Sequence, residues 1–142
     1  MKHATCTVIL LFFTITLWAQ AAVYITADQD NLQKYADVDF KGQFSVLVEK
    51  SGSNNIYLVD FSRLATRFER VYFMNLSFNT HRIVNIDPTV QENRVRFMSY
   101  EKNEPADVLK QLEEMRIKAT QTATAWTTEE KSDWLVKNDK YN

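Results

Sequence analysis

The chain has 142 residues, with 17 Lys and Arg against 18 Asp and Glu, two glycines, two prolines and one cysteine. This length suits one domain, and an apolar share of 45% is too high for a disordered chain. A net charge of −1 gives no electrostatic reason to expect nucleic acid or an anionic membrane surface as a partner. Two isolated glycines also exclude the glycine-rich loops that cradle nucleotide phosphates.

The first 21 residues have the pattern of a secretory signal peptide. Lys2 gives a basic start, residues 8–18 are apolar, and residues 19–21 (Ala-Gln-Ala) fit a signal-peptidase site. The apolar stretch is shorter than the roughly 20 residues of a membrane-spanning helix. Cys6 would leave with the signal, so the remaining chain would contain no cysteine. A small exported domain without disulfides favours a bacterial protein, periplasmic or secreted, with no membrane span after cleavage.

A short helix and a β-hairpin are predicted next. The helical pattern begins at Thr26, a capping residue with Gln29 three positions later. Residues 44–49 alternate in the manner of a strand, and a turn cluster at 51–55 separates them from an extended run at 56–59. Two such runs around a polar turn predict a hairpin.

One helix and three strands are predicted in the middle of the chain. Apolar residues at positions 61, 64, 65 and 68 have helical spacing after a capping residue, Asp60 or Ser62. The aromatic and aliphatic run at 71–78 predicts a strand, and a second extended run follows at 83–86. A turn is then expected at Asp87-Pro88, because proline fixes φ there, and a last strand at 94–100.

Two helices are predicted at the end. Asn103 and Pro105 open the first of them. Its apolar stripe consists of Val108, Leu109, Leu112, Met115 and Ala119. The Thr/Ala-rich residues 120–125 fit either a weak helix or a linker. Thr127 and Glu130 have the spacing of a capping box and start a terminal helix.

Together these elements predict an α+β fold. Short connections favour antiparallel neighbours, so we expect a two-layer sandwich: a mainly antiparallel sheet of about five strands with helices on one face. The expected organisation is a signal peptide at 1–21, an α+β domain at 22–119, and a linker with a C-terminal amphipathic helix at 120–142. Residues 83–115 resemble the second half of ferredoxin-like domains, which implies a fold that is ferredoxin-like in part. The Cys-x-x-Cys loop of metal-transport members is absent.

Few residues point to catalysis or to a metal. His81 is the one histidine beyond the expected signal peptide, and it is either a lone general base or a solvated turn residue. Residues 37–42 begin like a calcium-binding EF-hand loop, but Lys41 and Val48 stand where calcium ligands are required. No catalytic residue, metal or cofactor is therefore expected.

The last predicted strand carries a first candidate surface for partner binding. Its members share one face of the strand: Arg94, Arg96, Met98 and Tyr100. Interfaces favour aromatic residues, Met and Arg. The same pattern also fits a half-covered core along which arginine stems lie.

The C-terminal segment carries a second candidate surface. Trp126, Trp134 and Leu135 are apolar anchors that follow the Thr/Ala-rich stretch. A short amphipathic helix can dock in a groove of a partner. Alternatively, this helix folds back on its own sheet and completes the core.

These observations favour a small exported binding or accessory protein without catalytic activity. It would act through contact with another envelope or secreted protein. Two alternatives stay open: a small enzyme whose site combines His81 with carboxylates, and a soluble carrier of a small apolar ligand.

Overall fold

The structure is a computed structural model that describes residues 34–91 and 93–139. The expected signal peptide and the start of the predicted helix at Thr26 lie outside these residues. The chain divides into two compact units, Met1–Asp37 and Val38–Asn142, and every element named below belongs to the second unit. Within the described part, no helix combines the length and the apolar character needed to cross a membrane.

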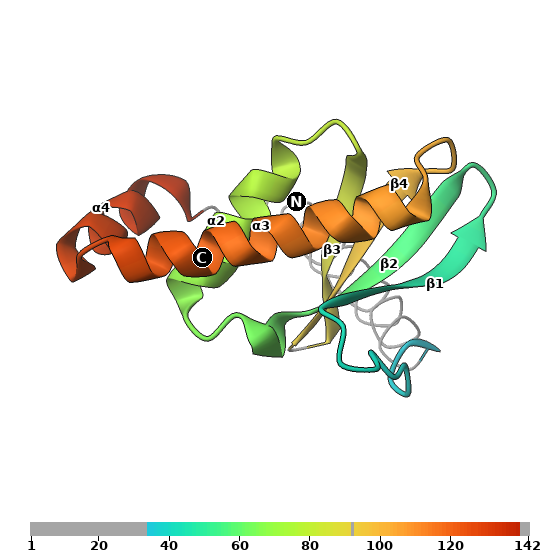
Figure 1. Cartoon of the computed structure of the whole chain (residues 1–142), viewed down its shortest axis with the longest axis horizontal. Helices are drawn as coiled ribbons and strands as arrows, with labels where there is room; N and C mark the ends of the chain where they lie inside the picture. The colour runs from blue at the N-terminus through green and yellow to red at the C-terminus, as the bar shows by residue number, and fades with distance from the viewer. Residues whose placement is uncertain (1–33, 92, 140–142) are drawn as a thin grey trace, which may run out of the picture. The chain divides into compact units, whose positions relative to one another are not determined.

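Four antiparallel strands form one sheet in the order β1-β2-β4-β3 (Figure 1). β1 (Ser45–Ser51) and β2 (Asn54–Asp60) form the predicted hairpin, and β3 (Ile83–Gln91) and β4 (Arg94–Tyr100) form a second one. Gly52 adopts a φ of 60° in the first hairpin turn, a conformation that glycine reaches without steric strain. The two hairpins join through β2 and β4, so β1 and β3 are the edges of the sheet.

The sheet has four strands instead of the expected five, because residues 71–78 belong to helix α2 (Arg67–Phe78). Thr66 and Glu69 start this helix as a capping box. The Glu69 N–H donates to Thr66 Oγ1 at 3.2 Å, and the Thr66 N–H donates to the Glu69 carboxylate at 2.7 Å. The strand prediction was wrong because a short apolar run rich in aromatic residues fits either a strand or a buried helix.

Two smaller differences concern turns. Asp60 acts as an N-cap, as predicted, but the element that it caps is the single 3₁₀ turn η1 (Phe61–Arg63). This turn ends before α2 begins. The turn expected at Asp87-Pro88 is absent, because β3 continues to Gln91. β3 is an edge strand with an irregular register between Asp87 and Gln91, and such a strand tolerates a residue without an N–H.

The C-terminal helices begin where the sequence predicts. α3 (Pro105–Ala125) has proline in its first turn and continues without interruption through residues 120–125. α4 (Thr128–Asn138) starts from the predicted capping box, in which the Glu130 N–H donates to Thr127 Oγ1 at 3.2 Å.

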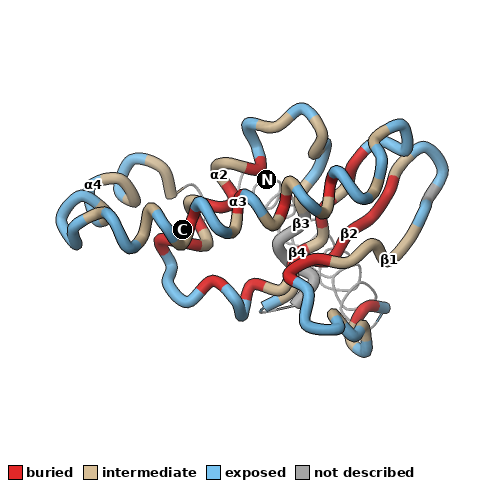
Figure 2. The backbone as a smooth tube through the Cα atoms, viewed as in Figure 1, coloured by how far each residue is buried: buried red, intermediate tan, exposed pale blue. Residues whose placement is uncertain are grey.

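The hydrophobic core lies between the sheet and helices α2 and α3. Burial along β4 alternates, and Val95 and Phe97 point to the helices. The Phe73 ring contacts three aromatic rings edge-on, those of Phe44, Phe61 and Phe97, with centroids 5.3 to 5.7 Å apart. Figure 2 shows that the inner strand β2 is buried along most of its length. This two-layer arrangement confirms the predicted α+β class.

Candidate functional site

The four predicted binding residues of β4 share the face of the sheet that points away from α2 and α3. Arg94, Arg96 and Met98 are half-buried, and Tyr100 is 46% exposed. The ammonium of Lys102 lies 5.5 Å from the Tyr100 ring centroid. The sequence therefore predicted correctly that these side chains share a face, and binding of a partner there stays a prediction.

This face of the sheet also holds buried apolar residues. Leu58 of β2 lies opposite Arg96, and Ile56 lies opposite Met98. Their side chains are 0% and 5% exposed, respectively, although neither belongs to the core under the helices. Arginine side chains whose aliphatic parts lie beside buried aliphatic residues fit the alternative to partner binding, in which this face is a half-covered core.

Trp126 and Trp134 pack on helix α2. Each indole contacts both Phe68 and Tyr72, with ring centroids 5.2 to 6.1 Å apart. Phe68 and Tyr72 stack on each other at 5.5 Å. We call these four rings the aromatic cluster. The C-terminal segment thus folds back on its own chain, against a helix and not against the sheet.

Polar contacts hold α4 in the same place. Arg67 Nε donates to the Asp139 carboxylate at 2.8 Å, joining the start of α2 to the end of α4. Lys131 Nζ donates to the Ala123 carbonyl at 2.8 Å, near the end of α3. The two groups of predicted residues therefore lie apart, because β4 presents its group on the sheet and the C-terminal group faces α2.

A groove lies where α2, α3 and α4 meet, with a volume of about 510 Å³. Four apolar residues line it, Ala65, Phe68, Ala123 and Leu135, together with four Thr and Ser residues and the charged side chains of Glu69 and Lys131. We call it the three-helix groove. Of the residues predicted from sequence, Leu135 lies in this groove.

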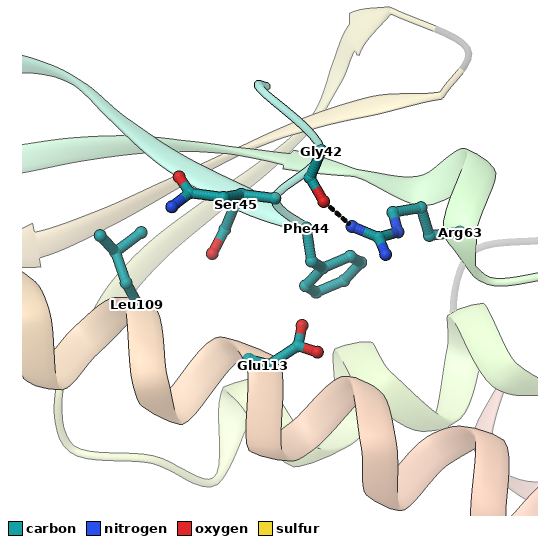
Figure 3. A pocket seen from close by; sticks show the side chains of 7 residues that line it. Gly42, Phe44, Ser45, Arg63, Leu109 and Glu113 are labelled. Carbon is teal, nitrogen blue, oxygen red and sulfur yellow. Dashed lines mark hydrogen bonds between the residues drawn. The ribbon is translucent and has the colours of Figure 1, made fainter. Parts of the chain in front are cut away.

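A second pocket lies between the start of β1, η1 and α3, with a volume of about 300 Å³ (Figure 3). We call it the β1 pocket; its lining residues are Gly42, Gln43, Phe44, Ser45, Arg63, Leu109 and Glu113. The Phe44 ring and Leu109 form apolar walls, and the Glu113 carboxylate faces the ring from α3. The Arg63 Nη1 donates to the Gly42 carbonyl at one side of the pocket.

An ion pair behind the β1 pocket sets its charge. Arg116 Nε and Nη2 donate to the two Glu113 oxygens at 2.9 and 2.6 Å, and the guanidinium lies 5.8 Å from the Phe44 ring centroid. The hydrogen bonds from Arg116 hold the pKa of Glu113 below its ordinary value, and the charges of Arg116 and Arg63 lower that pKa further. Glu113 is thus a carboxylate already neutralised by Arg116.

A wider depression adjoins the β1 pocket and shares Gly42, Gln43 and Arg63 with it. Lys41 and Gly42, with φ of 49° and 75°, make a tight turn there. The Asp39 carboxylate accepts from the Lys41 N–H at 2.8 Å, so this acidic residue serves the turn. Residues 37–42, which begin like an EF-hand loop, therefore contain a local turn.

His81 lies in a shallow polar depression of about 300 Å³ with Asp107 and Glu114. Asp107 pairs with Arg82 at 3.7 Å, and Glu114 pairs with Lys110 at 3.9 Å. Within residues 34–91 and 93–139, no group of three or more His, Cys, Asp or Glu side chains is placed to hold a metal ion. The enzyme hypothesis around His81 stays a prediction.

Sequence analysis missed the residues that build the β1 pocket. Glu113 and Arg116 are three positions apart, a spacing that pairs opposite charges on a helix, and this signal was available in the sequence. Nothing in the sequence indicates that Arg63 and Gly42 lie beside this pair, because their approach depends on how η1 and α3 pack.

The chain matches no protein-family model, no curated protein and no solved structure.

Proposed function

We propose that this protein is a small exported accessory protein without catalytic activity that acts by protein–protein contact in the bacterial cell envelope. The β1 pocket carries the proposal. Three separate segments place polar groups around apolar walls there, and Arg63 has hydrogen-bond donors without a partner among residues 34–91 and 93–139. Binding sites generally combine apolar walls with a few convergent polar groups. The signal-peptide pattern of residues 1–21 supports an envelope or secreted partner.

Site-specific photo-crosslinking in the protein's own cells tests this function. A benzoylphenylalanine replaces Gln43 at the exposed side of the β1 pocket, and the matched control places it at Val136, which is 85% exposed on α4. We expect one discrete crosslinked species from position 43 and none from position 136. Arg63→Glu should reduce the yield at position 43 at least fivefold. Equal labelling from both positions, or no discrete species from position 43, would reject the proposal.

The three-helix groove favours a second candidate function, a carrier of a small apolar ligand. Its four apolar lining residues offer a surface for such a ligand beside the aromatic cluster, although Glu69 and Lys131 also line the groove. The neutral fluorophore N-phenyl-1-naphthylamine should then bind one to one. Leu135→Lys should abolish this binding, whereas Val136→Lys on the same helix should not, because Leu135 lines the groove and Val136 is exposed. Weak, unsaturable fluorescence that is the same in both variants would exclude the carrier.

A further inference from the structure

We propose that the β1 pocket binds a carboxylate side chain of a partner protein, an Asp or Glu with an apolar neighbour, and that Arg63 is the residue that binds it. This inference rests on the proposed function and names the chemistry of the partner. Four observations carry it: the neutralised Glu113, the unused donors of Arg63, the size of the pocket, and the charges beside it.

The first observation concerns the charge of the pocket. Arg116 neutralises Glu113 through two short hydrogen bonds, so the carboxylate of the pocket is already paired. Arg63 forms no ion pair within the described residues, although it lines the same pocket. The surplus charge of the β1 pocket is therefore positive and belongs to Arg63.

The second observation concerns the donors of Arg63. A guanidinium carries five N–H donors in a planar fork. One nitrogen, Nη1, donates to the Gly42 carbonyl, which fixes the orientation of the group. The remaining donors have no partner in the described part of the chain. Planar forks of this kind bind carboxylates through two parallel hydrogen bonds, with more geometric specificity than a lysine provides.

The third observation concerns size and polarity. A volume of about 300 Å³ stands at the lower limit of small-molecule pockets, so it suits one side chain better than a whole metabolite. The Phe44 ring and Leu109 supply apolar walls on which the neighbouring side chain of a partner would pack. Partial exclusion of water by these walls strengthens an arginine–carboxylate interaction.

The fourth observation concerns the adjoining depression. It adds two cations, Lys41 and Arg94, and two carboxylates, those of Asp39 and Asp60. Both carboxylates already accept hydrogen bonds: Asp39 from the Lys41 N–H, and Asp60 from the N–H and hydroxyl of Ser62. The two carboxylates keep their negative charge and balance the two added cations, so the depression leaves the positive charge of Arg63 uncompensated.

NMR titration of the ¹⁵N-labelled full chain tests the inference with two blocked dipeptides. Acetyl-Leu-Glu-amide carries the carboxylate, and acetyl-Leu-Gln-amide is its uncharged match. We expect the Glu peptide to shift the backbone amides of residues 42–45 and the Arg63 Nε–H with saturation. The Gln peptide should bind at least tenfold more weakly. Arg63→Ala should abolish the response, and so should Arg63→Gln, which keeps a donor for the Gly42 carbonyl.

The matched control is Arg82→Ala, which removes the same charge outside the β1 pocket and should leave the titration unchanged. An equal response to both peptides, or an Arg63→Gln variant that still responds, overturns the inference. A well-dispersed spectrum of Arg63→Gln shows that the loss is local. The two proposals fail separately. Equal peptide responses reject the carboxylate even if the crosslinked species forms, and a missing crosslink rejects the protein partner even if the Glu peptide is preferred.

Discussion

Tyr57 carries a hydroxyl group into the hydrophobic core. The residue is fully buried on β2, and neither its hydroxyl nor the Asn55 Oδ1 two residues earlier has a hydrogen-bond partner within the described residues. Burial raises the pKa of the Tyr57 hydroxyl above its ordinary value of 10.0, and the nearby Asn55 side chain opposes this rise by less. A buried hydroxyl without a hydrogen-bond partner lowers the stability of the folded state.

Replacement of Tyr57 by Phe should therefore be neutral or stabilising at pH 7, by up to about 1 kcal/mol, because the ring stays and the unpaired hydroxyl goes. The pH dependence has a defined sign. A raised pKa in the folded state means that stability is complete below pH 10 and falls as the pH rises above it. Urea unfolding at pH 7 and pH 11 measures both effects.

The Tyr57→Phe variant should lose less stability between these two pH values than the wild type. Tyr100→Phe, at an exposed tyrosine, serves as the control and should follow the wild type. A Tyr57→Phe protein that is destabilised by more than about 1 kcal/mol at pH 7 would show that the hydroxyl does have a partner.

At the scale of elements, two helices share the same start signal but differ in what they bury. α2 and α4 both begin with Thr-x-x-Glu capping boxes. The two helices differ in burial, because α4 has no buried residue. The buried residues of α2 are Phe68, Glu69, Val71, Phe73, Met74 and Ser77. Hydrogen bonds from Thr127 hold the pKa of Glu130 below its ordinary value, so this cap is formed by a carboxylate at neutral pH.

Loss of the two caps should accordingly have unequal effects. Thr66→Ala should lower the free energy of unfolding by about 1 kcal/mol, because α2 is part of the core and unfolds with it. Thr127→Ala should lower it less, because α4 can fray without opening the core. Chemical denaturation followed by circular dichroism measures both values. Equal losses would mean that α4 unfolds together with the sheet.

At the scale of the whole molecule, α4 is attached to α2 and not to the sheet. The attachment consists of the aromatic cluster and the bond between Arg67 and Asp139. The core under the sheet closes without any α4 residue. The molecule therefore combines a sheet-and-helix core with a peripheral C-terminal helix, and the three-helix groove lies between the two.

Trp134→Ala should release α4 and leave the core folded. Amide hydrogen exchange in residues 128–138 should accelerate at least tenfold, since the indole supplies two of the ring contacts that hold the helix. Amides of β2 and β4 should keep their protection. Val136→Ala, at the exposed neighbouring position, is the control and should change neither region. Acceleration that extends to the inner strands would contradict this separation.

Local signals in the sequence were sufficient for much of the fold. The Gly52 turn predicted the first hairpin, and Pro105 and Thr127 predicted the starts of α3 and α4. These features act within one turn or one hairpin, so a few neighbouring residues determine them. The order of the elements then predicted an antiparallel α+β sandwich, since short connections leave few alternatives.

Only the tertiary structure decided what depends on residues far apart in the chain. The apolar pattern of residues 71–78 fits a strand and a helix equally well, and packing against α3 selects the helix. Pro88 continues β3 because that strand is an edge of the sheet. The β1 pocket brings Gly42, Arg63 and Glu113 together, although up to 71 positions separate them in the sequence. Such convergence has no local signature, because it arises when separate elements bury their apolar faces against one another.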